Sequence, residues 1–222
     1  MEKLLSDQVI KQINEAFTEL KETVQILYFG SKENCDHCLE TKQLLEEVVA
    51  LHEKLELSVY DIQGDHEIAD RFNVFHAPGI VIAAKNGSQI TDMGVQFSGI
   101  PSGHEFGTLI NDILMVSARD SGLNEKTRAF LKNLKQPLVL QVFVTPGCPY
   151  CPRAVLLAHQ MAMENPRLIR AEGVEATEFP ELANRFNVHG VPQTVINSGA
   201  GIVVGAAPEQ NLMAEISRAL RN

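Results

Sequence analysis

Residues 143–152 read Phe143-Val-Thr-Pro-Gly-Cys-Pro-Tyr-Cys-Pro152, with two cysteines three positions apart. The apolar run 138–144 precedes the pair, and apolar residues at helical spacing follow it. A strand followed by a helix is therefore predicted, with the cysteines at the junction. The first half has a similar arrangement, in which an apolar run at 24–29 precedes Cys35-Asp-His-Cys38.

An internal repeat shows that this similarity is not confined to the cysteines. The segment Glu67-Ile-Ala-Asp-Arg-Phe-Asn-Val-Phe-His-Ala-Pro-Gly-Ile-Val-Ile82 recurs 114 positions later as Glu181-Leu-Ala-Asn-Arg-Phe-Asn-Val-His-Gly-Val-Pro-Gln-Thr-Val-Ile196. The cysteine pairs repeat at a shift of 113 positions, so two independent landmarks indicate one duplication. The helical pattern breaks near residues 117–123, and we predict two domains, residues 1–118 and 119–222.

Each half is predicted to have the same order of elements. In the first half we expect helices over 4–20, after Cys38, within 67–72 and over 102–116, and strands over 24–29, 57–61 and 79–84. In the second we expect helices over 124–134, after Cys151, within 181–186 and over 208–220, and strands over 138–144, 168–174 and 193–197. Turns at Asn86-Gly87 and Ser198-Gly199 predict a last strand that returns antiparallel. The fold class is therefore α/β, with two tandem domains that each have a mixed central sheet flanked by helices.

Charge and hydropathy exclude several kinds of partner. The formal net charge of the 222 residues is −9 and no cluster of Lys and Arg opposes it, so neither nucleic acid nor an anionic membrane is expected as a partner. The stretch 1–7 mixes charged and apolar residues, unlike a signal peptide, and no run approaches the ~18 apolar residues of a membrane span. A cytoplasmic location is predicted.

The spacing of the cysteines predicts thiol-disulfide exchange. A thiolate must attack a substrate disulfide, and a second thiol must resolve the mixed disulfide that forms. At the start of a helix, free N–H groups and the helix dipole favour the thiolate of Cys35 and of Cys148, which are the predicted nucleophiles. Cys38 and Cys151, one turn further on, are the predicted resolving thiols and are expected to be more buried. Each pair is expected to form its own disulfide.

A zinc site is the main alternative for such pairs. A shared tetrahedral site has its second pair within roughly 12 to 20 residues of the first, whereas here a whole domain separates Cys38 from Cys148. The six histidines outside the cysteine motifs also lack ligand spacing, so surface or capping roles are expected for His52, His66, His76, His104, His159 and His189. No metal site is predicted.

The element order, with the cysteines at the first strand-to-helix junction and a proline 40 residues later, resembles thioredoxin. The stretch 143–152 is similar to the C-terminal site of the protein disulfide oxidoreductases, a family of double thioredoxin folds, and the resemblance covers nearly the whole chain. It implies that Pro78 and Pro192 are cis prolines facing the cysteines. It also implies that the backbone of Ala77 and of Val191 pairs with an extended substrate segment.

The sequence departs from the thioredoxin pattern in two respects. It has no Trp, so the aromatic residue that precedes the thioredoxin motif is absent. The acid that thioredoxins bury in the strand before the motif also has no counterpart, since Phe29 and Val142 occupy the corresponding positions. Proton transfer to the resolving cysteine is then expected to rely on water or on another carboxylate.

The expected function is that of a protein thiol-disulfide oxidoreductase, mainly a disulfide reductase, that needs no bound cofactor. Its expected substrates are proteins that contain disulfides, and the resemblance implies a flavoprotein of the thioredoxin-reductase type as electron donor. Two alternatives stay open. One is a dedicated electron donor to a peroxiredoxin or hydroperoxide reductase, like the double-thioredoxin module of the alkyl hydroperoxide reductase flavoprotein, which keeps one active pair. The other is a non-catalytic module that binds peptides.

Overall fold

The structure is a computed structural model that describes residues 3–33 and 35–221; the predicted domains also include Met1, Glu2, Asn34 and Asn222, which lie outside the described residues. The first half contains α1 (Asp7–Phe17), β1 (Val24–Gly30), α2 (Cys38–Val49), β2 (Leu55–Asp61), α3 (His66–Phe72), β3 (Gly79–Asn86), β4 (Gln89–Ser98) and α4 (His104–Ala118). The second half contains α5 (Glu125–Lys132), β5 (Leu138–Val144), α6 (Cys151–Glu164), β6 (Ile169–Glu175), α7 (Pro180–Arg185), β7 (Gln193–Ile196), a 3-10 turn η1 (Asn197–Gly199), β8 (Gly201–Val204) and α8 (Glu209–Ala219).

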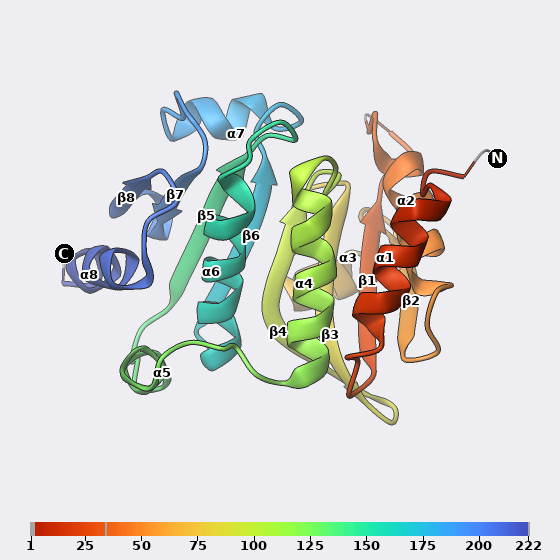
Figure 1. Cartoon of the computed structure of the whole chain (residues 1–222). Helices are drawn as coiled ribbons and strands as arrows, with labels where there is room; N and C mark the ends of the chain where they lie inside the picture. The colour runs from red at the N-terminus through yellow and green to blue at the C-terminus, as the bar shows by residue number, and fades with distance from the viewer. Residues whose placement is uncertain (1–2, 34, 222) are drawn as a thin grey trace.

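The strands form one sheet in the order β2-β1-β3-β4-β6-β5-β7-β8. In each half a parallel pair, β1 with β2 or β5 with β6, adjoins an antiparallel pair, β3 with β4 or β7 with β8. The predicted α/β fold and mixed sheets are therefore confirmed. The sequence did not indicate that the halves join edge to edge, through parallel pairing of β4 with β6 (Figure 1).

Both faces of the sheet are covered, as the nearly continuous apolar runs of β1 and β5 require. On one face a single hydrophobic core runs through both halves, beneath α1, α2, α4, α6 and α8. On the other face two small clusters lie beneath α3 and α7. In Figure 1, α4 and α6 lie side by side in front of the strands at the junction of the halves.

The predicted helix α1 is shorter than its apolar pattern. It begins at Asp7 because the side chain of Ser6 caps it and accepts a hydrogen bond from the backbone N–H of Val9 at 3.4 Å. In the second half, Asn124 caps α5 in the same way, with bonds of 3.0 Å from Lys126 and Thr127. Apolar spacing does not show where a helix begins or ends, so the helix predicted over 4–20 extended past α1 at both ends.

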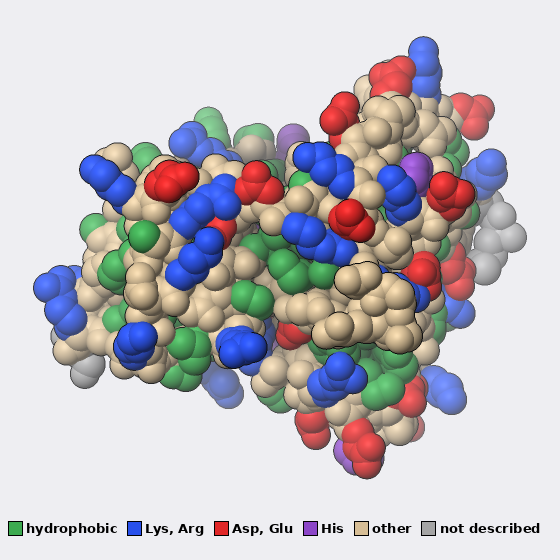
Figure 2. All heavy atoms as spheres, turned by 90° about the horizontal axis from the view of Figure 1, so that it is seen from below, with side chains coloured by type: hydrophobic (Ala, Val, Ile, Leu, Met, Phe, Trp, Pro, Cys, Tyr) green, Lys and Arg blue, Asp and Glu red, His purple; other side chains and the backbone are tan. Residues whose placement is uncertain are grey.

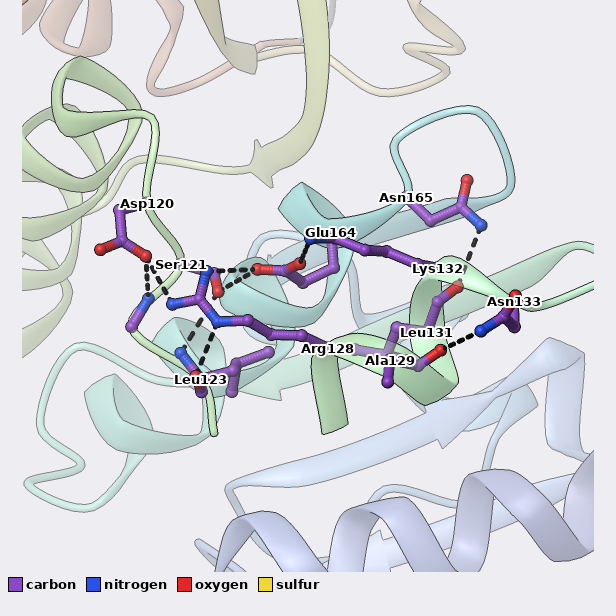
Figure 3. A network of polar contacts seen from close by, with 11 residues as sticks. Asp120, Ser121, Leu123, Arg128, Ala129, Leu131, Lys132, Asn133, Glu164 and Asn165 are labelled. Atoms are coloured by element: carbon purple, nitrogen blue, oxygen red, sulfur yellow. Dashed lines mark hydrogen bonds and ion pairs between the residues drawn. The ribbon is translucent and has the colours of Figure 1, made fainter. Parts of the chain in front are cut away.

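The connection between the halves is fastened to the second half (Figure 3). Arg128 of α5 bonds the carboxylate of Asp120 and donates to the carbonyl of Leu123 at 2.7 Å. It also pairs with Glu164 of α6 at 3.2 Å, and the hydroxyl of Ser121 donates to the same carboxylate. The boundary predicted after residue 118 lies just before this network, and we propose it as the division between the two domains.

Figure 2 shows the surface of the molecule at the end of the sheet where β1 and β5 begin. There Lys and Arg side chains lie among Asp, Glu and hydrophobic side chains. No helix among residues 3–33 and 35–221 is long and apolar enough to cross a membrane.

Gly94 allows β4 and β6 to approach closely. It has a φ of +71°, and a Cβ added there would lie 2.6 Å from the carbonyl oxygen of Ile169. We expect Gly94→Ala to lower the free energy of unfolding by at least about 1 kcal/mol more than Gly87→Ala. Gly87 is the matched control, because it has a φ of +59° with no heavy atom within 4 Å of an added Cβ. Urea unfolding measures both variants, and equal losses would contradict the close approach.

Candidate active sites

The two cysteine pairs lie at the same edge of the sheet. β1 ends at Gly30 before Cys35, and β5 ends at Val144 before Cys148. The order β1-β3-β4-β6-β5 puts four strand spacings between the two strands, roughly 19 Å at about 4.8 Å each. The structure joins Cys35 to Cys38 and Cys148 to Cys151, as the sequence predicted, and the distance between the sites excludes direct exchange without a large movement.

The first site has one partly exposed and one buried sulfur. The Cα atoms of Cys35 and Cys38 are 5.5 Å apart, and Cys38, at the first position of α2, is buried while Cys35 is partly exposed. The backbone N–H of Ser31 donates to Cys38 Sγ at 3.3 Å, and Tyr28 donates its hydroxyl to the Cys38 carbonyl at 2.6 Å. Burial raises the pKa of Tyr28 to about 12, so this hydroxyl stays protonated at neutral pH.

The second site has the same backbone frame with a different charge around it. The Cα atoms of Cys148 and Cys151 are also 5.5 Å apart, and Cys148 is 8% exposed against 0% for Cys151. The first turn of α6 has no acidic residue, whereas the first turn of α2 contains Glu40. Arg153, which is exposed in the first turn of α6, adds a positive charge two residues after Cys151. In both sites the second cysteine is the more buried, as predicted.

The two prolines have the predicted conformation. The Ala77–Pro78 and Val191–Pro192 peptide bonds are both cis. Each proline precedes a strand that pairs with the strand leading to the cysteines, β3 with β1 and β7 with β5. The carbonyls of Pro78 and Pro192 accept hydrogen bonds of 2.8 and 2.7 Å from the backbone N–H groups of Gly99 and Gly205, which directly follow β4 and β8. In the described part of the chain, the backbone groups of Ala77 and Val191 have no such bond.

Large apolar side chains are exposed beside both pairs. Leu39, directly after Cys38, is 84% exposed, and Phe75, three residues before Pro78, is 68% exposed. At the second site, Tyr150 lies between the cysteines and is 70% exposed. Exposed apolar groups around a reactive centre are typical of surfaces that bind other proteins.

A buried acid that sequence reasoning missed lies at the start of α4. Glu105 is 3% exposed, and neither oxygen of its carboxyl group has a hydrogen-bond partner among the described residues. Burial raises the pKa of Glu105 to about 7. The backbone N–H of the preceding residue, His104, donates to Pro146 in the loop before Cys148 at 3.1 Å. An acid in a first helical turn usually faces solvent, so the sequence alone gives no signal for this one.

The expectation of a surface or capping role for His159 was wrong. His159 is fully buried between α6 and α4, where Nδ1 lies 2.7 Å from Asp112 Oδ2 and Nε2 lies 3.0 Å from the carbonyl of Gln96. Burial raises the pKa of Asp112. The carbonyl can only accept, so Nε2 must donate to it, and one further proton is shared between Nδ1 and the carboxyl group of Asp112. The pair joins the halves, since Asp112 and Gln96 belong to the first and His159 to the second.

The described residues 3–33 and 35–221 contain no group of three or more His, Cys, Asp and Glu side chains placed to hold an ion. Both cysteine pairs are joined as disulfides. The two sulfur atoms of each pair are thus within bonding reach, as dithiol-disulfide exchange requires.

The structure has two C-x-x-C pairs, each at the start of a helix, and in each half a cis proline precedes the strand that pairs with the strand leading to the cysteines. These features define a double thioredoxin fold with two dithiol sites. The thioredoxin domain family matches residues 138–218. The crystal structure of a protein disulfide oxidoreductase from Aeropyrum pernix is 32% identical, with a TM-score of 0.88, and the match covers 98% of this chain and 94% of that one. The chain belongs to the protein disulfide oxidoreductase family, and it is a thioredoxin-like oxidoreductase with two C-x-x-C sites.

The alkyl hydroperoxide reductase AhpF is a second relative. The protein from Staphylococcus aureus is 28% identical over 188 residues, which are 85% of this chain and 33% of that protein. The structure of AhpF from Enterococcus faecalis has the same fold, with a TM-score of 0.85, 24% identity, and coverage of 96% of this chain and 99% of that one. The chain thus spans about a third of the length of the curated relatives it matches.

Proposed function

We propose that this oxidoreductase works mainly as a reductase of disulfides in polypeptides, with Cys35 and Cys148 as nucleophiles and Cys38 and Cys151 as resolving thiols. The observation that carries the proposal is the exposure of Leu39, Phe75 and Tyr150 around the two pairs. A small disulfide needs no such apolar surface, whereas a polypeptide segment covers it on binding.

Each turnover consists of two exchanges. The thiolate of Cys148, or of Cys35, attacks one sulfur of the substrate disulfide, and the other sulfur leaves as a thiolate that takes up a proton. The resolving thiolate then attacks the mixed disulfide and releases the second substrate thiol. The substrate gains two electrons, and the protein is left with the disulfide that the structure contains.

The substrate segment is proposed to lie along the two cis-proline turns. The partly exposed backbone of Ala77 and Val191 has unpaired polar groups, which suits the addition of an extended strand. Pro78 and Pro192 lack an N–H group and so leave the sulfur atoms free of a competing donor from these positions. The four residues together are the proposed substrate-binding set.

Glu105 is proposed to take the proton that Cys151 gives up. In thioredoxins this role belongs to the acid buried in the strand before the cysteine motif, which has no counterpart in this sequence. A carboxyl group with a pKa of about 7 exchanges protons readily at neutral pH. The contact of His104 with Pro146 puts the first turn of α4 against the loop that leads to Cys148.

The proposed setting is the cytoplasm, where dithiols are kept reduced, and the proposed electron donor is a flavoprotein of the thioredoxin-reductase type.

Reduction potentials test the direction of electron flow. We expect both pairs to have potentials below about −250 mV, close to those of reducing thioredoxins. The pairs are equilibrated with glutathione or dithiothreitol buffers and trapped by alkylation. Potentials near −120 to −180 mV would instead indicate an oxidase or isomerase and would overturn the proposed direction.

A second candidate is a dedicated electron donor to a peroxiredoxin or hydroperoxide reductase. The similarity to the alkyl hydroperoxide reductase AhpF favours it. The presence of two cysteine pairs favours a general reductase of polypeptide disulfides, because a dedicated electron donor needs only one pair. Rates of electron transfer to a peroxiredoxin and to insulin, measured with the same reduced protein, separate the two.

A further inference from the structure

A groove opens beside the first active site, where the two halves meet. Its volume is about 420 Å³, in the range of sites that take a side chain or small ligand. His76 of the first half forms part of its wall, and residues 178–182 and Arg185 of the second half form the rest. The wall therefore contains residues from both domains.

The side chain of His76 is held by the second half. Its ring packs against Phe179 with centroids 5.0 Å apart and planes tilted by 55°. Nδ1 of His76 lies 3.6 Å from Oε1 of Glu172, which also accepts from Ser98 and, through Oε2, from Gln141 at 2.9 Å. His76 comes two residues before Pro78, so the second half fixes the turn beside the first pair of cysteines.

Glu178, on the groove wall, also forms contacts between the two halves. Its Oε1 accepts from the backbone N–H of Ile100 at 2.7 Å, and its own N–H donates to Glu175 Oε2 at 2.7 Å. A Cβ added at Gly99 would lie 2.7 Å from Glu178 Oε1, so the fit requires glycine there. Gly99 in turn donates to the carbonyl of Pro78 at 2.8 Å. A continuous set of contacts thus leads from the cis proline to the carboxylate of Glu178.

Glu178 interacts electrostatically with charged residues of the first site. Burial raises the pKa of Glu178, the charge of His37 acts against this, and the charges of Glu175 and Glu40 add to it. His37 lies between Cys35 and Cys38, and Glu40 lies in the first turn of α2. On the groove wall itself, the carboxyl groups of Glu178 and Glu181 outnumber the one guanidinium group, that of Arg185, and Glu40 adds a further negative charge that acts on Glu178.

We propose that this groove binds the polypeptide segment next to the substrate cysteine that joins Cys35, and that Glu178 selects a Lys or Arg side chain in that segment. The inference rests on the proposed function, since it requires Cys35 to exchange with polypeptide disulfides. The ring of Phe179 beside Glu178 suits the same side chain, because a cation is attracted to an aromatic face. The second domain thereby determines the specificity of the first domain's site.

The test uses the full chain with Cys148→Ser and Cys151→Ser, so that only the first pair is active. Two peptide disulfides, identical except for Arg or Glu beside the cysteine, are reduced with dithiothreitol as final reductant, and hydroxyethyl disulfide reports the first pair's exchange chemistry. We expect kcat/KM for the Arg peptide to exceed that for the Glu peptide about tenfold at low salt, and the ratio to fall at high salt. Glu178→Gln should lower this ratio about threefold to fivefold.

Glu53→Gln is the matched control, because Glu53 is exposed at the opposite edge of the sheet and should leave the ratio unchanged. Two outcomes would contradict the proposed role of the groove while leaving the proposed function of Cys35 intact. One is a variant that reduces hydroxyethyl disulfide but shows no preference between the two peptides. The other is an unchanged ratio in Glu178→Gln. A first pair that reduces none of the three disulfides would refute the proposed function of Cys35, and the groove's role with it.

Discussion

Replacing Cys148 with serine should lower the rate of insulin reduction about tenfold at pH 7, whereas Cys35→Ser should lower it about twofold or less. The reason is the charge around each nucleophile. Asp36 follows Cys35 directly and Glu40 lies in the first turn of α2, while the first turn of α6 has no acid. Negative neighbours disfavour a thiolate, so more of Cys148 than of Cys35 should be ionised at neutral pH.

Accessibility works in the opposite direction, since Cys148 is buried in the disulfide form and Cys35 is partly exposed. We expect charge to decide, because substrate meets the reduced protein, in which the sulfur atoms are no longer joined. Titration of each single variant with iodoacetamide against pH gives the thiolate fraction independently of the insulin rate. If Cys148→Ser keeps most of the activity, or if Cys35 is the more readily ionised, the assignment of the main site is wrong.

Replacing Glu105 with glutamine should raise the free energy of unfolding at pH 8 by roughly 3 kcal/mol. Burial raises the pKa of Glu105 from an ordinary 4.5 to about 7 in the folded protein. Between these values the folded state binds more protons than the unfolded state, so stability falls as pH rises. The loss begins near pH 4.5 and is complete above pH 7, and a glutamine at this position would not titrate. Urea unfolding at pH 5 and pH 8 measures the difference.

Glu125→Gln is the matched control, because Glu125 is also an acid in a first helical turn but is exposed. It should change stability by a few tenths of a kcal/mol and leave the pH dependence intact. A Glu105→Gln protein with the parent's pH dependence would contradict the buried ionisable group. The same variant tests the proposed proton transfer, since alkylation of Cys151 against pH should then shift to higher pH.

The sequence predicted the fold well because its signals are local and occur twice. The apolar runs of β1 and β5 and the helices after Cys38 and Cys151 appear where the periodicity placed them. The pairing of β4 with β6 is different. It joins strands about 75 residues apart in the sequence, and nothing in either strand specifies its neighbour at the sheet edge.

The site residues also fall into two groups, those that the sequence predicts and those that only the folded structure identifies. Both cysteine pairs and both cis prolines follow from motifs and a family resemblance, so their positions could be named in advance. Glu105, Glu178 and His159 acquire their surroundings from elements far along the chain: Glu178 bonds Ile100, and His159 bonds Asp112. Charged and polar residues in helices and loops usually face solvent, and only packing identifies the exceptions.

The acceleration of insulin reduction by dithiothreitol tests most directly whether the two C-x-x-C pairs are catalytic. The measurement follows insulin turbidity with the parent protein and with the double variant Cys35→Ser/Cys148→Ser, after circular dichroism has shown that the variant is folded. We expect clear acceleration by the parent and none by the double variant. No acceleration by the parent, or acceleration that persists without Cys35 and Cys148, would contradict the assignment of these two sulfur atoms as the nucleophiles.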